Sequence, residues 1–389
     1  MAGYLKFIQN VIVLFIMLMM TTCCRNEQSD IKEILYVGTF DERDSQGIYV
    51  YEFNRDSVGF TLLQTIPEQK SPSFLEIHPS RKFLYAVNRS SVIEGKEWGT
   101  ISAFLIDSAS GMLTLINEQS SYGRGPCHIS FDKSGKFAFV SNYNDGNLVV
   151  YAVLDKGSVS DSLQLVQHHG HGINPERQEG PHVHSAMVSP DNRFLYVADL
   201  GIDKVMIYEL NSSSGLLKPA AIPYAEVEPG SGPRHFEIQP DGKTLFLAEE
   251  LSSTTSVFSR DTVNGSLTEI QRISSIPEGF REQNTNADIH IHPDGKFLYV
   301  SNRGHNSIAI YHIHKNGFLS VIGYQSTLGD RPRNFMIDQT GRLLFAANRN
   351  SDNINVFELN AKTGMLDFTG AALEVPGAVC LKMLQMPAK

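Results

Sequence analysis

Cysteine is scarce in this chain of 389 residues, which contains only four. Cys127 and Cys380 are the two that lie beyond the N-terminal segment, and two isolated cysteines do not make a disulfide framework. The sequence also lacks a zinc-binding HExxH pair, a phosphate-binding loop of the form GxxxxGK(S/T) and a Gly-x-Ser-x-Gly nucleophile elbow. These absences argue against a disulfide-stapled scaffold, a closed zinc site and a serine hydrolase.

Long runs of charge of one sign are absent as well, and the formal net charge is −9. A general nucleic-acid-binding protein would carry a basic stripe, so we expect no nucleic-acid partner. Aliphatic and aromatic residues occur in the proportion usual for a globular protein. We therefore expect an ordered, folded chain beyond the N-terminal segment.

The one long apolar run, Phe7–Met20, is interrupted by only two polar residues. It is too short for a comfortable membrane span and has the length of a signal-peptide core. The small residues before Cys23 and Cys24 resemble a bacterial lipoprotein cleavage site, at which a cysteine becomes the lipidated N-terminus. We expect residues 1–24 to be a lipoprotein-type signal peptide and residues 25–32 a short linker. The protein would then be exported and would meet the membrane through a lipid anchor; an uncleaved anchor and a plain secretory signal are the alternatives.

A unit of about fifty residues recurs along the rest of the chain. Its most regular part is an octapeptide, with the copies EILYVGTF, KFLYAVNR, KFAFVSNY, RFLYVADL, KTLFLAEE, KFLYVSNR and RLLFAANR. The equivalent aromatic residues are Tyr36, Tyr85, Phe139, Tyr196, Phe246, Tyr299 and Phe345, spaced 49, 54, 57, 50, 53 and 46 residues apart. A β-rich repeat of this period is typical of a propeller, in which no unit can bury a core alone. We expect one domain over residues 33–387.

Each unit contains four strand signals separated by turns. In Gly232–Ile273, a first strand ends at the turn Pro240-Asp241-Gly242, KTLFLAEE is the second strand, SVFSR is the third, and Asn264-Gly265 precedes the fourth. No first strand precedes Glu33, whereas Pro376–Gln385 looks like a first strand with no second strand after it. The sequence therefore predicts an all-β, seven-bladed β-propeller with four antiparallel strands per blade. The N- and C-terminal strands would close the ring in one blade and leave no open edge.

Polar residues gather at the strand ends that share one rim of such a ring. Antiparallel pairing places the start of each first strand beside the end of each second strand, opposite the Pro-Asp-Gly turns. At the starts of first strands are Ser71, Ser73, His128, His182, His184, Arg234, His235, Asp288, His290, Arg331, Arg333 and Asn334. At the ends of second strands are Asn88, Arg89, Asn142, Asp199, Glu249, Glu250, Asn302, Arg303, Asn348 and Arg349. We expect the two sets to meet at one mouth of the central channel, with the long insertion Gln167–Gly180 over it.

Residues that differ between the copies are better candidates for function than residues that recur. Asparagine recurs in equivalent places, as a turn-forming or blade-bridging residue does. His184, Arg234, Glu250 and Arg303 differ from their counterparts. Guanidinium groups hold carboxylate or phosphate bidentately and stabilise an oxyanion, while a carboxylate beside them, its pKa lowered, activates water. The pattern predicts a site for a small anionic substrate.

A cluster of histidines raises the alternative of a zinc site. Its members are His168, His169, His171, His182 and His184. No ligand spacing typical of a closed zinc site supports this alternative, and we predict neither a metal nor a cofactor.

Five longer segments carry a family resemblance when taken in order. They are GPCHISFDKSGKFAFVSNYNDGNLVVY, PHVHSAMVSPDNRFLYVADLGIDKV, GPRHFEIQPDGKTLFLAEEL, ADIHIHPDGKFLYVSNRGHNSI and RPRNFMIDQTGRLLFAANRNSDNINVF. Together they resemble the lactonase family of seven-bladed propellers, which includes bacterial 6-phosphogluconolactonases and fungal carboxymuconate-lactonizing enzymes. The similarity runs from about Ile34 to Met386.

The resemblance implies which residues form the active site. The family's arginine of Gly-Pro-Arg-His corresponds to Arg234, its glutamate at the end of the next strand to Glu250, and its histidine to His184. The arginine ending Tyr-Val-Ser-Asn-Arg is Arg303, and Arg177, Gln178 and His182 match members with a longer loop. Two departures bear on substrate charge: Arg89 stands where an acidic residue is expected, and Glu249 replaces a common asparagine.

We therefore predict a lactone hydrolase of the 6-phosphogluconolactonase type, with Glu250, Arg234, Arg303 and His184 as catalytic residues. The predicted substrate-binding residues are His182, Arg177, Asn142, Asp199, His290 and Arg333. Because the phosphorylated lactone is a cytoplasmic metabolite, another sugar lactone is an alternative substrate for an exported form. A muconate-type cyclising enzyme and a non-catalytic exported propeller that binds a ligand are the alternative functions.

Overall fold

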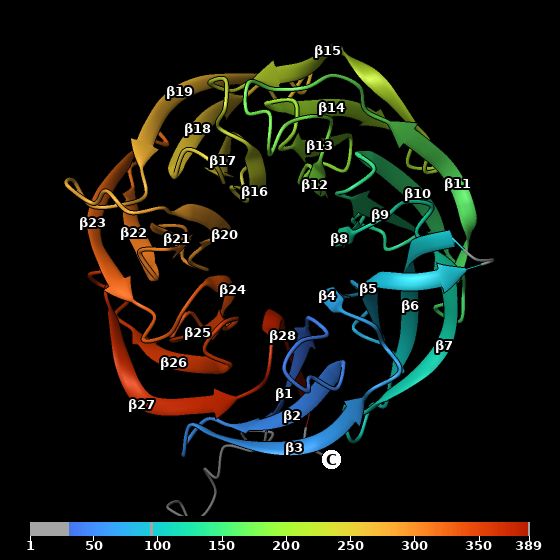
Figure 1. The fold of residues 1–389 in the computed structure, drawn as a ribbon, viewed down its shortest axis with the longest axis vertical. Helices are drawn as coiled ribbons and strands as arrows, with labels where there is room; N and C mark the ends of the chain where they lie inside the picture. The colour runs from blue at the N-terminus through green and yellow to red at the C-terminus, as the bar shows by residue number, and fades with distance from the viewer. Residues whose placement is uncertain (1–30, 94–95, 388–389) are drawn as a thin grey trace, which may run out of the picture.

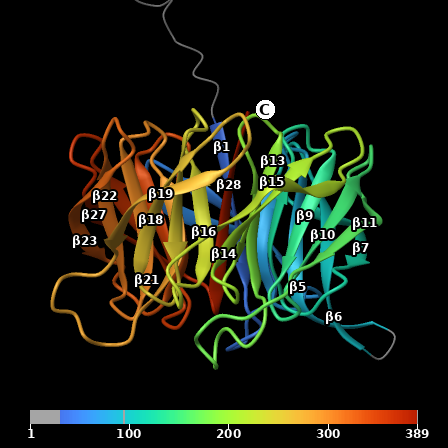
Figure 2. The same ribbon diagram turned by 90° about the horizontal axis from the view of Figure 1, so that it is seen from above.

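The computed structural model describes residues 31–93 and 96–387. Its strands form seven four-stranded antiparallel sheets arranged around a central channel, as seen end-on in Figure 1 and from the side in Figure 2. This confirms the predicted seven-bladed propeller. The predicted signal peptide, residues 1–24, and most of the predicted linker lie outside the described residues. Within the described ranges, no helix is long and apolar enough to cross a membrane.

The four strands of each blade run from the channel to the outer wall in chain order, the ring-closing blade excepted. The innermost strands are β28 (Ala378–Pro387), β4 (Pro72–Ile77), β8 (Pro126–Phe131), β12 (Val183–Val188), β16 (Pro233–Ile238), β20 (Thr285–Ile291) and β24 (Pro332–Ile337). The second strands are β1 (Ile31–Thr39), β5 (Phe83–Ile93), β9 (Phe137–Asn142), β13 (Phe194–Asp199), β17 (Thr244–Glu249), β21 (Phe297–Arg303) and β25 (Leu343–Asn348). The third strands are β2 (Ile48–Asn54), β6 (Lys96–Ile106), β10 (Asn147–Val153), β14 (Lys204–Leu210), β18 (Thr254–Arg260), β22 (Ser307–Ile313) and β26 (Asn353–Leu359). The outermost strands are β3 (Gly59–Ile66), β7 (Leu113–Ser120), β11 (Val159–Gln167), β15 (Leu217–Glu226), β19 (Leu267–Ser274), β23 (Leu319–Ser326) and β27 (Leu366–Glu374).

The ring is closed by the two ends of the chain in one blade, as predicted. Strand β28 pairs antiparallel with β1 and supplies the innermost strand of that blade. Strand β1 begins at Ile31, two residues before the predicted start of the propeller, because Ile31 and Lys32 pair with Pro387 and Met386. Closure by both termini completes this blade with its fourth strand, so that β1 is paired on both sides.

The repeated aromatic residues form the core between the blades. All seven, from Tyr36 to Phe345, are fully buried. In four blades the hydroxyl also donates to the carbonyl of a turn glycine in the following blade, for example from Tyr299 to Gly364 at 2.9 Å. That glycine has a φ of 74°, which favours glycine over other residues. The repeated octapeptide therefore supplies both the core and a polar link between neighbouring blades.

A β-bulge occurs near the start of every innermost strand. In β16 the register with β17 passes from Pro233 to His235, so that Arg234 has no partner residue. The equivalent unpaired residues include His184 in β12 and Arg333 in β24. A bulge leaves one extra residue outside the ladder and redirects its side chain. The bulges thus position three of the predicted site residues.

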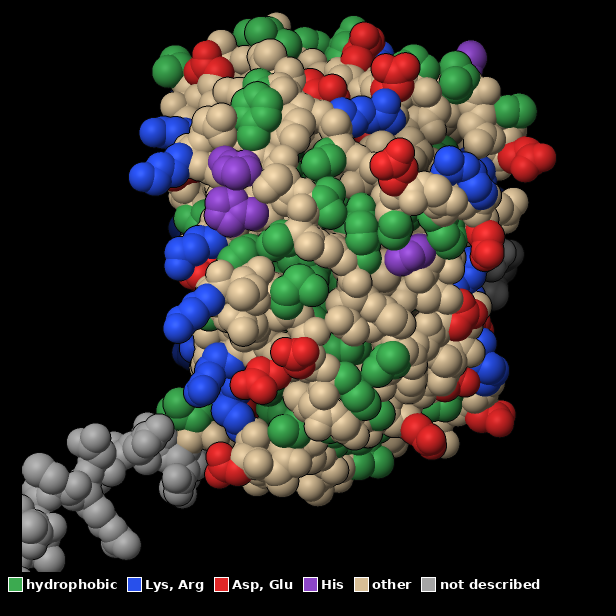
Figure 3. All heavy atoms as spheres, turned by 90° about the vertical axis from the view of Figure 1, so that its left-hand side faces the viewer, with side chains coloured by type: hydrophobic (Ala, Val, Ile, Leu, Met, Phe, Trp, Pro, Cys, Tyr) green, Lys and Arg blue, Asp and Glu red, His purple; other side chains and the backbone are tan. Residues whose placement is uncertain are grey.

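The structure places two cavities at opposite ends of the channel, which we call the front pocket and the rear cavity. Residues at the starts of innermost strands and the ends of second strands line the front pocket. Pro79, Lys133 and Pro190, in the turns between first and second strands, line the rear cavity. The side of the molecule shown in Figure 3 carries acidic, basic and apolar side chains, with Lys and Arg more frequent along the left-hand edge of the view.

Candidate active site

The front pocket has a volume of about 540 Å³ and is rich in arginine. It is lined by Phe40, Asp41, Glu42, Ser71, Arg89, Tyr143, Arg177, His184, Glu250, Thr285, Arg303, Arg331, Arg333 and Arg349. Six of these fourteen residues are arginines and three are acidic. The local charge is therefore positive although the chain as a whole carries a net charge of −9. Such a pocket attracts anions.

The carboxylate of Glu250 is held by three guanidinium groups. Arg234 donates from Nε to Oε2 at 2.9 Å, and Arg303 places Nη2 2.8 Å from the same oxygen. Arg177, from the loop between β11 and β12, donates from Nη2 to Oε1 at 2.6 Å. These residues come from three blades, so the closed ring is what brings them together. Glu250 and Arg234 are both buried, whereas the side chain of Arg177 is 38% exposed.

The surrounding charges set the ionisation of Glu250. Burial alone raises the pKa of its carboxyl, but Arg303, Arg234 and Arg177 outweigh burial and hold that pKa well below its usual range. Burial in turn lowers the pKa of Arg303 to about 10, against the opposing effect of Glu250. At neutral pH the pocket floor is thus a carboxylate among guanidinium cations. A carboxylate in this state is a weak base until one of its arginines leaves it.

His184 completes the floor of the pocket. Its Nδ1 is buried and has no hydrogen-bond partner among the described residues. Burial, followed by the charge of Arg234, lowers the pKa of His184 well below its usual range, so the ring is neutral at pH 7. The ring lies edge-on to Tyr143, with centroids 5.6 Å apart. The Tyr143 hydroxyl also accepts a hydrogen bond from Arg177 at 3.2 Å.

A second group of arginines surrounds Phe40 where the ring-closing blade meets its two neighbouring blades. The guanidinium carbons of Arg349, Arg333 and Arg89 lie 4.5, 5.0 and 5.7 Å from the ring centroid. Arg349 also pairs with Glu42. Within the described part of the chain, no carboxylate pairs with Arg89 or Arg333. These two cations are free to bind an anionic ligand.

Four of the predicted binding residues do not line the front pocket. Asn142 donates to the Ser121 carbonyl at 2.8 Å, and Asp199 accepts from His168 and from the backbone of His182, so both support the loops around the pocket. The His182 ring stacks on Tyr143 with a centroid distance of 4.4 Å, one layer behind the pocket surface. His290 lines the rear cavity. It lies three residues before the proline of its Pro-Asp-Gly turn, as Glu237 does in the preceding blade, so it is equivalent to Glu237 and not to His235. His128, His235 and Asp288, which were also expected at this mouth, line the rear cavity too.

Tyr143, Phe40 and Glu42 line the pocket but were not among the residues predicted from the sequence. A signal for two of them is present in the repeat. The last residue of the octapeptide lines the front pocket in six of its seven copies, as Phe40, Arg89, Tyr143, Glu250, Arg303 and Arg349. Leu200 is the exception, and it is buried. Reading that one position of the repeat would have predicted six of the fourteen residues that line the pocket.

The histidine-rich insertion does not form a cluster suited to a metal. His168 is paired with Asp199 and Tyr208, while His169 and His171 are exposed. In residues 31–93 and 96–387, no group of three or more His, Cys, Asp or Glu side chains is placed to hold a metal ion.

Fold and site together define a seven-bladed propeller with a buried carboxylate–arginine centre at one mouth of its channel. Residues 34–383 match the family model described as lactonase, 7-bladed beta-propeller. The chain therefore belongs to the family of seven-bladed β-propeller lactonases.

Individual relatives cover nearly the whole chain. The chain is 40% identical to a 6-phosphogluconolactonase of Formosa agariphila over 360 residues, which are 90% of this chain and 99% of that one. It is 34% identical to the 6-phosphogluconolactonase of Bacillus subtilis over 91% of this chain and 99% of that one. Among solved structures, the periplasmic gluconolactonase of Pseudomonas aeruginosa is 31% identical and superimposes with a TM-score of 0.86, covering 92% of this chain and all of that one.

Proposed function

We propose that the protein hydrolyses a phosphorylated sugar lactone to the open acid, with 6-phosphogluconolactone as the first substrate to test. The observation that carries the proposal is the buried Glu250 carboxylate, which contacts three arginines from different blades beside the neutral His184. The names of the Formosa and Bacillus relatives support the choice of substrate.

In the proposed reaction, a water oxygen bonds to the lactone carbonyl carbon and the ring C–O bond breaks. Arg303 and Arg234 stabilise the oxyanion of the tetrahedral intermediate. Glu250 takes one proton from the attacking water and returns it to the departing ring oxygen. His184 takes the acid proton of the product. The net products are the hydroxy carboxylate and one proton.

Glu250 becomes competent as a base when Arg177 moves away from it. The side chain of Arg177 is the most exposed of the three that hold Glu250, at 38% against 2% for Arg234 and 9% for Arg303. When Arg177 turns from Glu250 to the bound substrate, the carboxylate loses one of the three cations that lower its pKa. Substrate binding thereby activates the base, so the water is deprotonated only in a filled site.

The phosphate is assigned to Arg89 and Arg333. Both line the pocket, and neither pairs with a carboxylate among the described residues. Burial and the neighbouring arginines lower the pKa of Arg333 well below its usual range, against the opposing effect of Glu250. A phosphate with its three acceptor oxygens would supply a further counter-charge.

Steady-state assays on the Glu250→Gln variant test the mechanism. We expect kcat for 6-phosphogluconolactone to fall by at least 100-fold, because the amide cannot take a proton from water. The matched control is Glu249→Gln, since Glu249 is buried but pairs with Arg272 and Ser256 away from the pocket. Unchanged turnover in folded Glu250→Gln contradicts the mechanism.

A panel of substrates separates the alternative functions. Turnover of muconolactone or its open dicarboxylate instead of sugar lactones identifies a cyclising enzyme, for which the same arginines would bind the two carboxylates. Tight sugar-lactone binding without turnover by the wild type identifies a binding protein. Hydrolysis of gluconolactone in preference to its phosphate assigns the non-phosphorylated sugar lactone.

We further propose that the protein is an exported lipoprotein, as the cysteines after the apolar N-terminal run suggest. The periplasmic location named for the Pseudomonas neighbour supports export. Strand β1 runs from Ile31 to Thr39, and the next residue, Phe40, lines the front pocket. Ile31, at the other end of the strand, therefore lies at the rear face. An anchor at Cys23 or Cys24 would therefore hold the front pocket facing away from the membrane. Metabolic labelling with palmitate should mark the wild type and not a Cys23→Ser, Cys24→Ser double variant.

A further inference from the structure

Three buried histidines from consecutive blades lie in a row through the central channel. They are His184 in β12, His235 in β16 and His128 in β8, and each is less than a tenth exposed. The ring centroids of His184 and His235 are 5.0 Å apart, and those of His235 and His128 are 5.6 Å apart. His184 lines the front pocket, whereas His235 and His128 line the rear cavity. The row therefore connects the two cavities.

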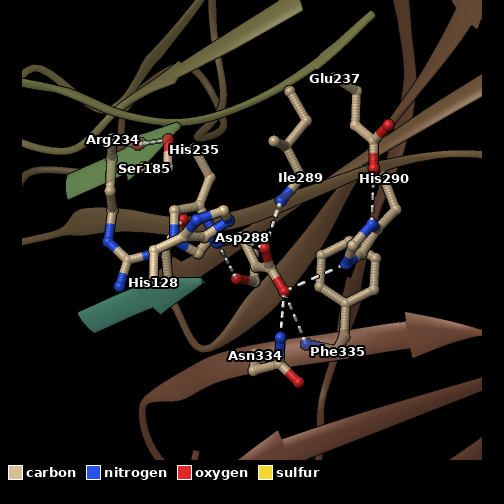
Figure 4. A network of polar contacts seen from close by, with 12 residues as sticks. His128, Ser185, Arg234, His235, Glu237, Asp288, Ile289, His290, Asn334 and Phe335 are labelled. Carbon is tan, nitrogen blue, oxygen red and sulfur yellow. Dashed lines mark hydrogen bonds and ion pairs between the residues drawn. The ribbon is translucent and has the colours of Figure 1, made fainter. Parts of the chain in front are cut away.

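His235 is held in one tautomer by Asp288. Nδ1 of His235 lies 2.8 Å from Oδ1 of Asp288. Figure 4 marks this contact with a dashed line. A carboxylate accepts a hydrogen bond from Nδ1–H, which leaves the lone pair of Nε2 free to accept a proton. That Nε2 is buried and has no hydrogen-bond partner among the described residues.

Asp288 is itself fixed from several directions. His290 places Nε2 3.1 Å from Oδ2, and the backbone N–H of Phe335 donates to the same oxygen at 3.3 Å. The side-chain amide of Asn334 also donates to it (Figure 4). A carboxylate with so many donors has little freedom to rotate, so the orientation of His235 follows from that of Asp288.

The two cavities differ in charge. The front pocket contains six arginines and three acidic residues, and a proton produced there meets a positive potential on its way out. The rear cavity, of about 370 Å³, is lined by Glu76, Asp132, Glu237 and Asp288 against two lysines and His290, whose pKa Asp288 and Glu237 raise to about 10. The charged groups facing the three histidine rings are Arg234, Arg303, Arg333, Asp288 and Lys382. The electrostatic gradient along the row runs from positive at the front to more acidic at the rear.

We propose that His184, His235 and His128 pass the proton released by hydrolysis from the front pocket to the rear cavity, and that Asp288 positions His235 for this transfer. This proposal rests on the proposed function, because lactone opening yields one proton per turnover. His235 takes the proton at Nε2 from His184 through one water and gives it up from the same nitrogen toward His128 through another. Nδ1–H stays with Asp288, which stabilises the transient imidazolium. The bound acid leaves through the front while its proton leaves through the rear.

Kinetics of a His235→Phe variant test the path. We expect kcat to fall at least tenfold with KM within twofold of the wild type, because substrate contacts stay in place. High concentrations of imidazole buffer should restore part of the lost rate by carrying the proton instead. Asp288→Asn should lower kcat in the same direction and shift the pH profile of kcat. The matched control is His292→Gln, since His292 is a buried histidine paired with Asp294 on the turn after β20, away from the row.

A wild-type rate in His235→Phe, or a loss that imidazole does not restore, overturns the proton path while leaving the lactonase function intact. A second readout does not depend on turnover. In ¹⁵N NMR spectra of the histidine side chains, exchange of the His184 ring proton with solvent should slow at least tenfold in His235→Phe. An unchanged exchange rate in His235→Phe contradicts the proton path, whether or not the wild type hydrolyses a lactone. Absence of lactone hydrolysis by the wild type, taken alone, overturns only the proposed function.

Discussion

Arg234 and Glu250 lie at the front ends of adjacent strands of one blade, where Nε of the arginine donates to Oε2 of the glutamate at 2.9 Å. Both are buried, and Arg234 also donates to the carbonyl of Ala287 in the next blade at 2.5 Å. This pair therefore links the Glu250 carboxylate to two blades. Removing one partner of a buried ion pair leaves the other charge without compensation.

Replacing Arg234 by methionine should cost about 3 to 5 kcal/mol of unfolding free energy. It should also lower kcat by at least 100-fold, because an oxyanion-stabilising donor is lost. Denaturant unfolding and steady-state kinetics measure the two effects. Arg260→Met is the control: Arg260 is buried in the same blade, pairs with Asp191 at 3.2 Å and lies at the rear, so stability should fall with kcat retained. Full activity in Arg234→Met would remove this arginine from the mechanism.

Arg89 and Arg333 should govern the affinity for the phosphate group. In Arg89→Ser and Arg333→Gln, we expect KM for 6-phosphogluconolactone to rise at least tenfold, which corresponds to about 1.4 kcal/mol of binding free energy. KM for non-phosphorylated gluconolactone should change little, because that substrate has no group for these cations. Arg342→Gln, at an exposed position outside the pocket, is the control. Equal effects on both lactones would argue that these arginines do not contact a phosphate.

The ion pairs of His290 should make stability depend on pH. Burial disfavours its imidazolium, but Asp288 and Glu237 outweigh burial and raise the pKa of His290 to about 10. The unfolded value is about 6.5, so the stabilisation is fully present below that pH and is lost as the pH rises through the folded value. His290→Gln should therefore cost on the order of 2 kcal/mol at pH 6 and much less at pH 10.5. Unfolding curves of both proteins across this range measure the difference, and a gap that is constant with pH would contradict the assignment.

The hydroxyl of Tyr299 should contribute to the link between blades. Its donor bond to the Gly364 carbonyl is 2.9 Å long and buried, and Tyr299→Phe should cost about 1 kcal/mol of unfolding free energy. A phenylalanine ring fits this position as well as a tyrosine ring does, since Phe139, Phe246 and Phe345 occupy the equivalent position in three blades. Tyr224→Phe, on outer strand β15 and 38% exposed, should change stability by less than about 0.5 kcal/mol. Equal stability of Tyr299→Phe and the wild type would show that the blades are held by apolar packing alone.

The sequence by itself determined the ring. Seven copies of one octapeptide, each with a buried aromatic residue, predicted the number of blades, and the unmatched strands at the two ends predicted the closure by β28 and β1. It also singled out His184, Arg234, Glu250 and Arg303, because they break a pattern that the other copies keep. These features are local or periodic, so they can be read along the chain.

Only the tertiary structure decided which polar residues share a site. His184 and His235 both lie near the start of an innermost strand, yet one lines the front pocket and the other the rear cavity. The direction of each side chain depends on the bulge register with the second strand, which is set by hydrogen bonds between segments distant in sequence. The arginines around Phe40 likewise meet only when the first and last blades close the ring. A repeat fixes how many blades there are, whereas register and closure decide what faces the channel.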